Sequence, residues 1–266
     1  MTSQSTWYET AVTDLTDPHD QRVWSVIVSL FGDMAQAPGT RISGGTLTRI
    51  IEPIGIKPEA IRVALHRLRK DGWIESDRMG RVSRHVLTEF GRAQSAAVTP
   101  RIYARTPVMA EHWHLLIAED GNTQVLEDIM LSHDYIPIGR NVALGSGTPT
   151  DHAGALLVLA ISPQTAPTWL QDRLCPQELR ASCQTLLAAT RRVARSRPDG
   201  WTPTPLQSAT LRTLLVHRWR RVVLRQPDLP PAFYPPDWAG PACRESVMQL
   251  LDTLPRPSAD TLSAPG

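Results

Sequence analysis

The chain has 266 residues and a formal net charge of +2 at pH 7, and 41% of its residues are hydrophobic and 20% are charged. This composition excludes a wholly disordered chain, and the length suffices for one large domain or for two to three small ones. No run of about 18 apolar residues predicts a membrane span, and the N-terminus lacks the features of a secretory signal. The three cysteines are widely spaced and predict neither a disulfide framework nor a metal site, so we expect a cytoplasmic protein.

Basic residues are concentrated in two blocks. Residues 41–92 hold eleven Lys and Arg against six Asp and Glu, and residues 191–225 hold nine against one. The rest of the chain is acidic on balance. Two basic blocks on an otherwise acidic chain predict anionic partners at two places.

The N-terminal third of the chain predicts three helices followed by a hairpin. The first helix is expected to take Asp17 as its N-cap and Pro18 as its first residue. The second covers GGTLTRIIEP with Thr46 as a possible cap, and the third opens at Pro58. The segment WIESDRMGRVSRHVL then predicts two short strands around a Met-Gly turn. This order is typical of a winged helix-turn-helix domain, which we assign to residues 18–95.

The remaining chain divides into three regions, which makes the predicted fold an α+β multidomain protein. Between residues 100 and 165, short strands alternate with a helix, from HWHLLIAED to GALLVLAIS, and predict a ferredoxin-like α+β domain. Residues 166–254 have a helical pattern, and we assign them to a C-terminal helical domain for dimerisation or effector binding. Residues 255–266 predict a disordered tail.

The third helix of the N-terminal region has an apolar stripe and a basic face. At 100° per residue, four apolar residues fall on one side of this helix: Ile61, Ala64, Leu65 and Leu68. A solvated amphipathic helix would show the same pattern. The position after a tight turn, and the basic hairpin that follows, favour a recognition helix beside a wing.

Seven residues are therefore candidates for DNA contact: Arg62, His66, Arg69, Lys70, Arg78, Arg81 and Arg84. Arg62 and His66 lie on the exposed face near the helix start, where we expect contacts to base edges, because Arg can donate two hydrogen bonds to guanine. The other five are expected to contact phosphates, which position a protein on DNA without specifying sequence. Arg67 falls on the opposite flank and is expected to make a structural or a backbone-phosphate contact.

Three segments of the chain resemble the PaaX-type regulators, which are transcriptional repressors of phenylacetic acid degradation. The segments are VWSVIVSLFGDM, IRVALHRLRKDGWIESDRMGRVSRHVLTEFG and LVHRWRRVVLRQPDLPPAFYPPDWAG. The resemblance covers the N-terminal and C-terminal parts in the family's order. It implies a winged-helix repressor with a ferredoxin-like middle domain and a helical C-terminal domain. It also implies a homodimer whose affinity for operator DNA falls when an aryl-acyl-CoA, typically phenylacetyl-CoA, binds.

The second basic block has several interpretations. One is a cradle for the phosphates of an acyl-CoA effector, with Arg side chains as clamps and a Trp side chain beside the acyl group. The residues expected in this cradle are Arg192, Arg195, Arg218, Arg220 and Trp219. The alternatives are a solvated helix surface with salt bridges to the acidic middle region, or contact with flanking DNA.

An enzyme is the rival hypothesis. A metal-dependent nucleic-acid-processing enzyme would need acidic ligands at a strand end of the middle region, where Asp120 and Asp134 are the nearest candidates. The pair His112 and His114 has spacing that a metal can use on a strand, but no acidic or Cys partner has matching spacing. No nucleophile-elbow or phosphate-loop motif is present, so we expect neither catalysis, nor a cofactor, nor a bound metal.

Overall fold

A computed structural model describes residues 3–17, 22–80, 82–107, 109–121, 123–132, 135–162, 165–226 and 228–263. Within these residues the chain is mixed α and β, with one three-stranded and one four-stranded sheet, both antiparallel. Among the described helices, none has both the length and the apolar character needed to cross a lipid bilayer. The chain forms two compact units. The first comprises Met1–Arg105, Ala181–Arg225 and Ala239–Gly266, and the second comprises Thr106–Arg180 and Gln226–Trp238.

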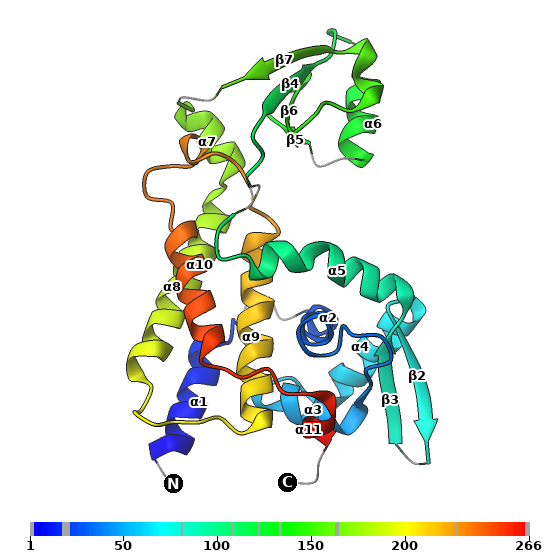
Figure 1. Ribbon diagram of the computed structural model, residues 1–266, viewed down its shortest axis with the longest axis vertical. Helices are drawn as coiled ribbons and strands as arrows, with labels where there is room; N and C mark the ends of the chain where they lie inside the picture. The colour runs from blue at the N-terminus through cyan, green and yellow to red at the C-terminus, as the bar shows by residue number, and fades with distance from the viewer. Residues whose placement is uncertain are drawn as a thin grey trace. The chain divides into compact units, whose positions relative to one another are not determined.

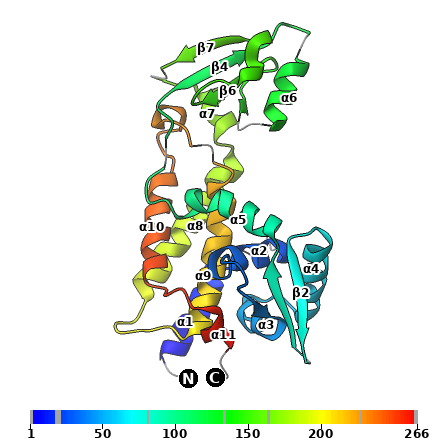
Figure 2. The ribbon, with the colours of Figure 1, turned by 45° about the vertical axis from the view of Figure 1, so that its right-hand side comes forward.

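The first unit opens with helices and a small sheet (Figures 1 and 2). Its N-terminal elements are α1 (Ser3–Leu15), α2 (Val23–Met34), β1 (Ile42–Ser43), α3 (Gly44–Ile51), the 3-10 turn η1 (Glu52–Ile54), α4 (Pro58–Lys70), β2 (Ile74–Met79), β3 (Val82–Leu87) and α5 (Glu89–Tyr103). Strand β3 lies between β1 and β2. The three predicted helices and the hairpin correspond to α2, α3, α4 and the β2–β3 pair. Helices α1 and α5 are additional to the prediction.

Local sequence explains how α3 and α4 begin and end. The side chain of Ser43 accepts a hydrogen bond from the backbone amide of Thr46 at 3.0 Å, so Ser43 is the N-cap of α3. The prediction of Thr46 as the cap was therefore wrong, because Thr46 supplies the amide that is capped. Helix α4 starts with Pro58, whose fixed φ suits a first helical position, and it ends before Gly72, which has φ of 72°.

Two further expectations about the ends of elements need correction. Helix α2 begins at Val23 with Arg22 as its extended N-cap residue, so Asp17 does not cap it. Pro18 lies outside the described residues. The predicted disordered tail instead contains the short helix α11 (Ala259–Ser263), and its Leu262 is buried. An apolar side chain with a place in the core explains why this segment is packed.

Helix α9 is the centre of the first unit. The remaining elements of this unit are the part of α8 (Gln177–Ser196) from Ala181 onward, α9 (Pro205–Val223), α10 (Gly240–Asp252) and α11. All residues from Ser208 to Trp219 are buried, because α1, α2, α3, α5 and α10 pack around α9. A helix that is covered on every side cannot belong to a separate surface domain. The predicted division at residues 95 and 166 therefore does not match the compact units, since α9 completes the core of the N-terminal elements.

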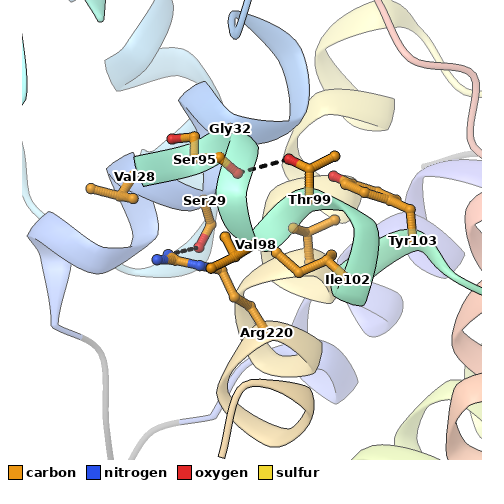
Figure 3. Close-up of a pocket in the computed structure, with 10 residues that line it drawn as sticks. Val28, Ser29, Gly32, Ser95, Val98, Thr99, Ile102, Tyr103 and Arg220 are labelled. Atoms are coloured by element: carbon orange, nitrogen blue, oxygen red, sulfur yellow. Dashed lines mark hydrogen bonds between the residues drawn. The ribbon is translucent and has the colours of Figure 1, made fainter. Parts of the chain in front are cut away.

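The polar groups of α9 have specific partners. The hydroxyl of Thr210 donates to the carbonyl of Ile50 at 2.9 Å, and the indole of Trp219 donates to the carbonyl of Ile102 at 2.8 Å. Arg220 reaches the hydroxyl of Ser29 at 3.3 Å beside a small cavity between α2, α5 and α9, which has a volume of about 10 Å³ (Figure 3). Buried polar groups cost free energy unless they are paired, so these hydrogen bonds fix the position of α9 in the unit.

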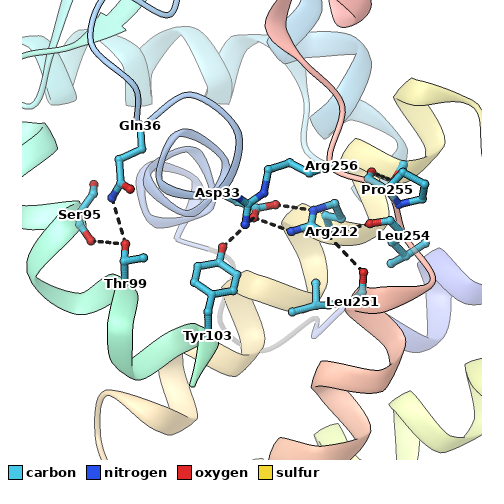
Figure 4. Close-up of polar contacts among 11 residues, drawn as sticks. Asp33, Gln36, Ser95, Thr99, Tyr103, Arg212, Leu251, Leu254, Pro255 and Arg256 are labelled. Carbon is cyan, nitrogen blue, oxygen red and sulfur yellow. Dashed lines mark hydrogen bonds and ion pairs between the residues drawn. The ribbon is translucent and has the colours of Figure 1, made fainter. Parts of the chain in front are cut away.

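A buried ion pair joins α2 to α9 (Figure 4). Asp33 and Arg212 make two hydrogen bonds of 2.7 Å, and their side chains are 0% and 6% exposed. The hydroxyl of Tyr103 donates to Asp33 at 2.7 Å, and Arg256 pairs with the same carboxylate at 3.2 Å. Burial opposes the charge of Arg212 most strongly, but the hydrogen bonds to Asp33, the charge of Asp33 and the neighbouring Tyr103 together outweigh burial and raise the pKa of Arg212. Burial, together with the charge of Asp33, raises the pKa of Tyr103.

The second unit is built on a four-stranded sheet. Its elements are β4 (Trp113–Ile117), α6 (Gln124–Ser132), β5 (Ile136–Pro137), β6 (Val142–Ser146), the 3-10 turn η2 (Asp151–Ala155), β7 (Leu157–Ile161), α7 (Thr168–Leu174), the start of α8 and the 3-10 turn η3 (Pro231–Phe233). The strand order is β5-β6-β4-β7, and all neighbours are antiparallel. The predicted strands and helix of this region are all present.

Each face of this sheet has its own core. On one face Leu116 packs with Leu126 and Ile129 of α6. On the other face Trp113 packs with Leu170 of α7 and Phe233 of η3. Because segments after residue 165 cover the sheet, this unit is larger than the predicted domain of residues 100–165.

Candidate nucleic-acid interface

Helix α4 has the two faces that the sequence predicts. Its buried residues are Ile61, Ala64, Leu65 and Leu68. The basic side chains of Arg62, His66, Arg69 and Lys70 are exposed. The apolar stripe fixes α4 against α2 and β2, so the basic face points to solvent as one surface.

The basic side chains on the outward face of α4 make exposed contacts within the chain. Arg62 donates to Glu59 at 3.2 Å, and both side chains are about 70% exposed. Arg69 lies 3.5 Å from the ring of His66. Exposed ion pairs of this kind contribute little to stability, so a phosphate or a base edge can replace them at small cost.

Arg67 has a structural role, as its place on the opposite flank predicts. Its guanidinium pairs with Asp71 at 3.4 Å and lies 5.4 Å from the ring centroid of Trp24 on α2. A cation over an indole face is attracted by the electron density of the ring. Arg67 therefore links α4 to α2.

The β2–β3 hairpin extends the basic surface. Arg78 is exposed near the tip, and Arg84 is half-buried on β3, where it lies opposite Asp77. Two apolar side chains at the tip, Met79 and Val82, are exposed. Arg81 lies outside the described residues. An exposed basic hairpin with apolar side chains at its tip has the chemistry to contact a DNA backbone and groove.

His85 on β3 links the two strands of the hairpin. It is buried on β3, and its Nδ1 lies 2.7 Å from the hydroxyl of Ser76 on β2. Burial lowers the pKa of His85, and the charge of Arg69 lowers it further, while Asp77 opposes the shift. His85 is not among the predicted site residues, because a lone His in a strand gives no indication that it is buried.

An open groove of about 1040 Å³ lies beside the hairpin. It is lined by the N-terminal end of α3, by β3, and by Ser258 and Asp260 of the C-terminal segment. Three arginines contribute to it: Arg41, Arg49 and Arg84. Arg41 also pairs with Asp77 at 2.8 Å, and Arg49 donates to the carbonyl of Leu262. Arg41 and Arg49 are not among the predicted DNA contacts, although both belong to the first basic block.

The five residues of the predicted cradle lie in different environments. Trp219 is fully buried, and Arg218 donates to the carbonyls of Asp14 and Leu15. Burial lowers the pKa values of Arg218 and Arg220. Neighbouring helical residues point about 100° apart, so Arg218, Trp219 and Arg220 point in different directions. Arg192 pairs with Asp14 at 3.0 Å, and Arg192 and Arg195 are both exposed on the surface of α8.

A different part of this block lines a cavity of about 240 Å³ in the first unit. The lining residues are Arg22, Trp24, Ser25, His217, Arg221 and Arg225. Arg221 pairs with Asp17 at 3.5 Å. The ring of Trp24 both lines this cavity and contacts Arg67 of α4. Three guanidinium groups around an indole give the cavity the chemistry to hold an anion with a planar or apolar neighbour.

The described residues offer no metal centre. No three His, Cys, Asp or Glu side chains among them are close enough to hold an ion. His114 is buried and bonds to the hydroxyl of Tyr135 at 3.0 Å, whereas His112 is exposed and precedes the strand. Asp120 accepts a hydrogen bond from Asn141 at 3.1 Å, and Asp134 lies outside the described residues.

A basic helix and a basic hairpin on one compact unit are typical of proteins that bind nucleic acid. Comparison with known families gives the more particular assignment. Residues 22–91 match the family described as PaaX-like protein, and residues 176–264 match its C-terminal domain. The chain belongs to the PaaX-like family, which confirms the resemblance found in the sequence.

Two individual proteins are similar to this chain. It is 27% identical over 251 residues to the transcriptional repressor PaaX of Escherichia coli strain K12, a match that covers 86% of this chain and 79% of that protein. A solved structure of an uncharacterized protein from Mycobacterium tuberculosis is 19% identical, with a TM-score of 0.48, and covers 86% of this chain and 94% of the other.

Proposed function

We propose that this protein is a cytoplasmic, DNA-binding transcriptional repressor of an aromatic-acid catabolic operon of the phenylacetate type. Membership of the PaaX-like family and the similarity to a transcriptional repressor support this function. The observation that carries it is the basic surface of α4 and the β2–β3 hairpin, which the fold holds outward. The protein is not an enzyme in this proposal.

The elements around α4 form a winged helix-turn-helix domain in this proposal. Helices α2 and α3 support α4, which acts as the recognition helix, and the β2–β3 hairpin is the wing. The second unit is ferredoxin-like, and the strand order β5-β6-β4-β7 supports this, with η2 in the place of a second helix. As a homodimer, the protein presents two recognition helices to a roughly palindromic operator.

The exposed residues of α4 and of the wing contact different parts of the DNA. Arg62 and His66 contact base edges in the major groove, where a well-placed Arg contact to guanine contributes about 1–3 kcal/mol of discrimination. Phosphates are contacted by Arg69, Lys70, Arg78 and Arg84, with Arg81 as a further candidate. The groove beside the wing adds Arg41 and Arg49 as phosphate contacts.

A gel shift with the DNA upstream of the protein's own gene tests this function. Wild-type protein should retain this fragment in preference to unrelated DNA of equal length. Arg62→Ala should weaken binding to the specific fragment about tenfold or more while changing binding to unrelated DNA little. Arg191→Ala, which removes an exposed arginine from α8, is the matched control and should bind as wild type does. Equal retention of both DNAs by wild type and Arg62→Ala contradicts the proposal.

The effector is an acyl-CoA thioester in this proposal, and the 240 Å³ cavity holds an anionic part of it. Arg22, Arg221 and Arg225 clamp the anion, since Arg suits phosphate oxygens. Trp24 lies between this cavity and Arg67, so an occupant that moves the indole also moves α4. In this proposal the effector binds more tightly when α4 is displaced than when α4 is in its DNA-binding position. This difference in affinity couples the two sites.

A panel of acyl-CoA thioesters and the matching free acids, added to the gel shift, tests the effector site. One thioester should release wild-type protein from DNA, and the free acid should not. Arg225→Gln should bind DNA normally but need about tenfold more thioester for release, whereas Arg191→Gln should respond as wild type does. Release of Arg225→Gln at the wild-type concentration would show that the effector binds elsewhere. Mg²⁺-dependent cleavage of the labelled DNA that Asp120→Ala abolishes would favour the rival enzyme.

A further inference from the structure

Val63 is an exposed apolar residue in the middle of helix α4. All thirteen residues of α4 are described, and Val63, which is 71% exposed, is the one exposed apolar side chain among them. At about 100° per residue, Val63 lies about 20° from Lys70 and about 60° from His66 around the helix, away from the buried stripe. The basic face of α4 therefore has one apolar side chain within it.

Neither core packing nor helix formation favours a valine at position 63. The side chain faces solvent, so burial contributes little to stability there. A branched Cβ restricts side-chain freedom in a helix, which makes valine a weaker helix former than lysine, arginine or alanine. A contact with a bound partner would account for this residue, because binding would bury its methyl groups.

The neighbours of Val63 indicate which partner this would be. His66 lies one turn after Val63, and Glu59, which pairs with Arg62 at 3.2 Å, lies one turn before it. In the proposed function this face enters the major groove of DNA. The base edges in that groove present hydrogen-bonding groups and one apolar group, the 5-methyl group of thymine. The side chain of valine has no charge and no hydrogen-bonding group, so it matches the methyl group and not the polar edges.

We propose that Val63 contacts the 5-methyl group of one thymine in each half-site of the operator and so determines the base at that position. This inference rests on the proposed function, because it requires α4 to lie in the major groove. The contact buries the methyl groups of Val63 against the methyl group of thymine and removes both from water. Cytosine, adenine and guanine lack this methyl group, so each of them would leave Val63 against a polar edge.

The geometry of α4 places this thymine near the bases that Arg62 and His66 contact. Residues three apart on a helix have Cβ atoms about 5–6 Å apart, and successive base pairs are about 3.4 Å apart. The thymine should therefore lie about two base pairs from the base that His66 contacts. Arg62 and Val63 point about 100° apart, so they contact different bases. Each half-site is then specified by a guanine and a nearby thymine.

Replacement of thymine by uracil tests this contact, because uracil pairs with adenine as thymine does and lacks only the 5-methyl group. Duplexes of the DNA upstream of the protein's own gene carry uracil at one thymine position at a time, and a gel shift measures the affinity of the full chain. For wild type, one position in each half-site should lower the affinity about fourfold, the loss expected for one buried methyl group. Uracil at this position in both half-sites should lower the affinity about fifteenfold.

The variant Val63→Ala assigns the effect of uracil to this side chain. It should bind thymine DNA more weakly than wild type does and lose nothing further with uracil, because the contact is already absent. Val63→Ile keeps a branched apolar side chain and should keep the uracil effect. Leu131→Ala is the matched control, since Leu131 lies on α6 and is 87% exposed, and it should respond as wild type does. Urea unfolding should show that Val63→Ala is at least as stable as wild type, because alanine is the better helix former.

The outcomes distinguish the contact from the function. If wild type prefers its upstream DNA and uracil lowers its affinity at no position, the contact is wrong and the repressor function stands. The same conclusion follows if the sensitive position responds equally in wild type and in Val63→Ala. If wild type shows no preference for its upstream DNA over unrelated DNA, the repressor function fails and the contact fails with it.

Discussion

Removal of the Asp33 carboxylate should destabilise the first unit strongly. In Asp33→Ala, the guanidinium of Arg212 stays buried, with 6% of its side chain exposed, and loses both of its 2.7 Å bonds to the carboxylate. Leaving one charge of a buried pair without its partner costs about 3–5 kcal/mol. Tyr103 also loses an acceptor, but Arg212 keeps its bond to the carbonyl of Leu254, so we expect a total of about 4 kcal/mol. This is a large fraction of the stability of a typical domain.

Urea unfolding followed by circular dichroism measures this loss in the free energy of unfolding. Two further variants make the test more specific. The double change Asp33→Leu with Arg212→Met removes both charges and should be clearly more stable than Asp33→Ala, since an apolar pair leaves no orphaned charge. Asp252→Ala breaks the exposed pair with Arg105 and should unfold as wild type does. A loss below about 1 kcal/mol in Asp33→Ala would refute the argument that the buried pair joins α2 to α9.

Three further predictions concern the elements that hold the basic surface. Ser43→Ala removes the cap on the amide of Thr46 and should cost about 1 kcal/mol in urea unfolding. Gly91→Ala places a Cβ against the carbonyl oxygen of Trp73 and should cost about 1–3 kcal/mol or prevent folding, as shown by the yield and melting of the purified variant. Because burial lowers the pKa of His85, this residue stabilises the fold above its ordinary pKa of about 6.5 and loses that contribution as pH falls. His85→Gln should therefore flatten the fall in melting temperature on acidification.

The sequence predicts the candidate surface well because that surface depends on local pattern. The helical spacing of Ile61, Leu65 and Leu68 is sufficient to orient α4, and all three are buried. The hairpin follows from a Met-Gly turn between two short strands, and Gly80 has a φ of 62° that suits this turn. Periodicity and turn chemistry act over a few residues, so they can be read without the tertiary structure.

The sequence of α1 has a helical pattern of apolar residues that was not used in the prediction. Trp7, Ala11, Val12 and Leu15 are buried and recur at helical spacing. This pattern was readable in the sequence and would have predicted the helix.

The second basic block shows that the burial and the partners of its arginines could not be predicted from the sequence. Arg212 and Arg218 look like surface residues of a basic helix, yet their partners are Asp33 and the carbonyl of Leu15, which are 179 and 203 residues away in the chain. The sequence does not distinguish a buried arginine from an exposed one, because burial depends on a partner that is distant in the chain. For the same reason, the cavity beside Trp24 could not be predicted, because it combines residues from α2 and α9.

The salt dependence of operator binding tests the central claim, that α4 and the hairpin bind DNA, most directly. Each phosphate contact adds about 0.9 to the slope of log K against log salt concentration, because binding releases counterions. Lys70→Ala should reduce this slope by about 0.9 per chain and weaken specific and nonspecific binding alike, whereas Arg191→Ala on α8 should leave both unchanged. An unchanged slope and affinity in Lys70→Ala, or an equal loss in Arg191→Ala, would contradict the assignment of this surface.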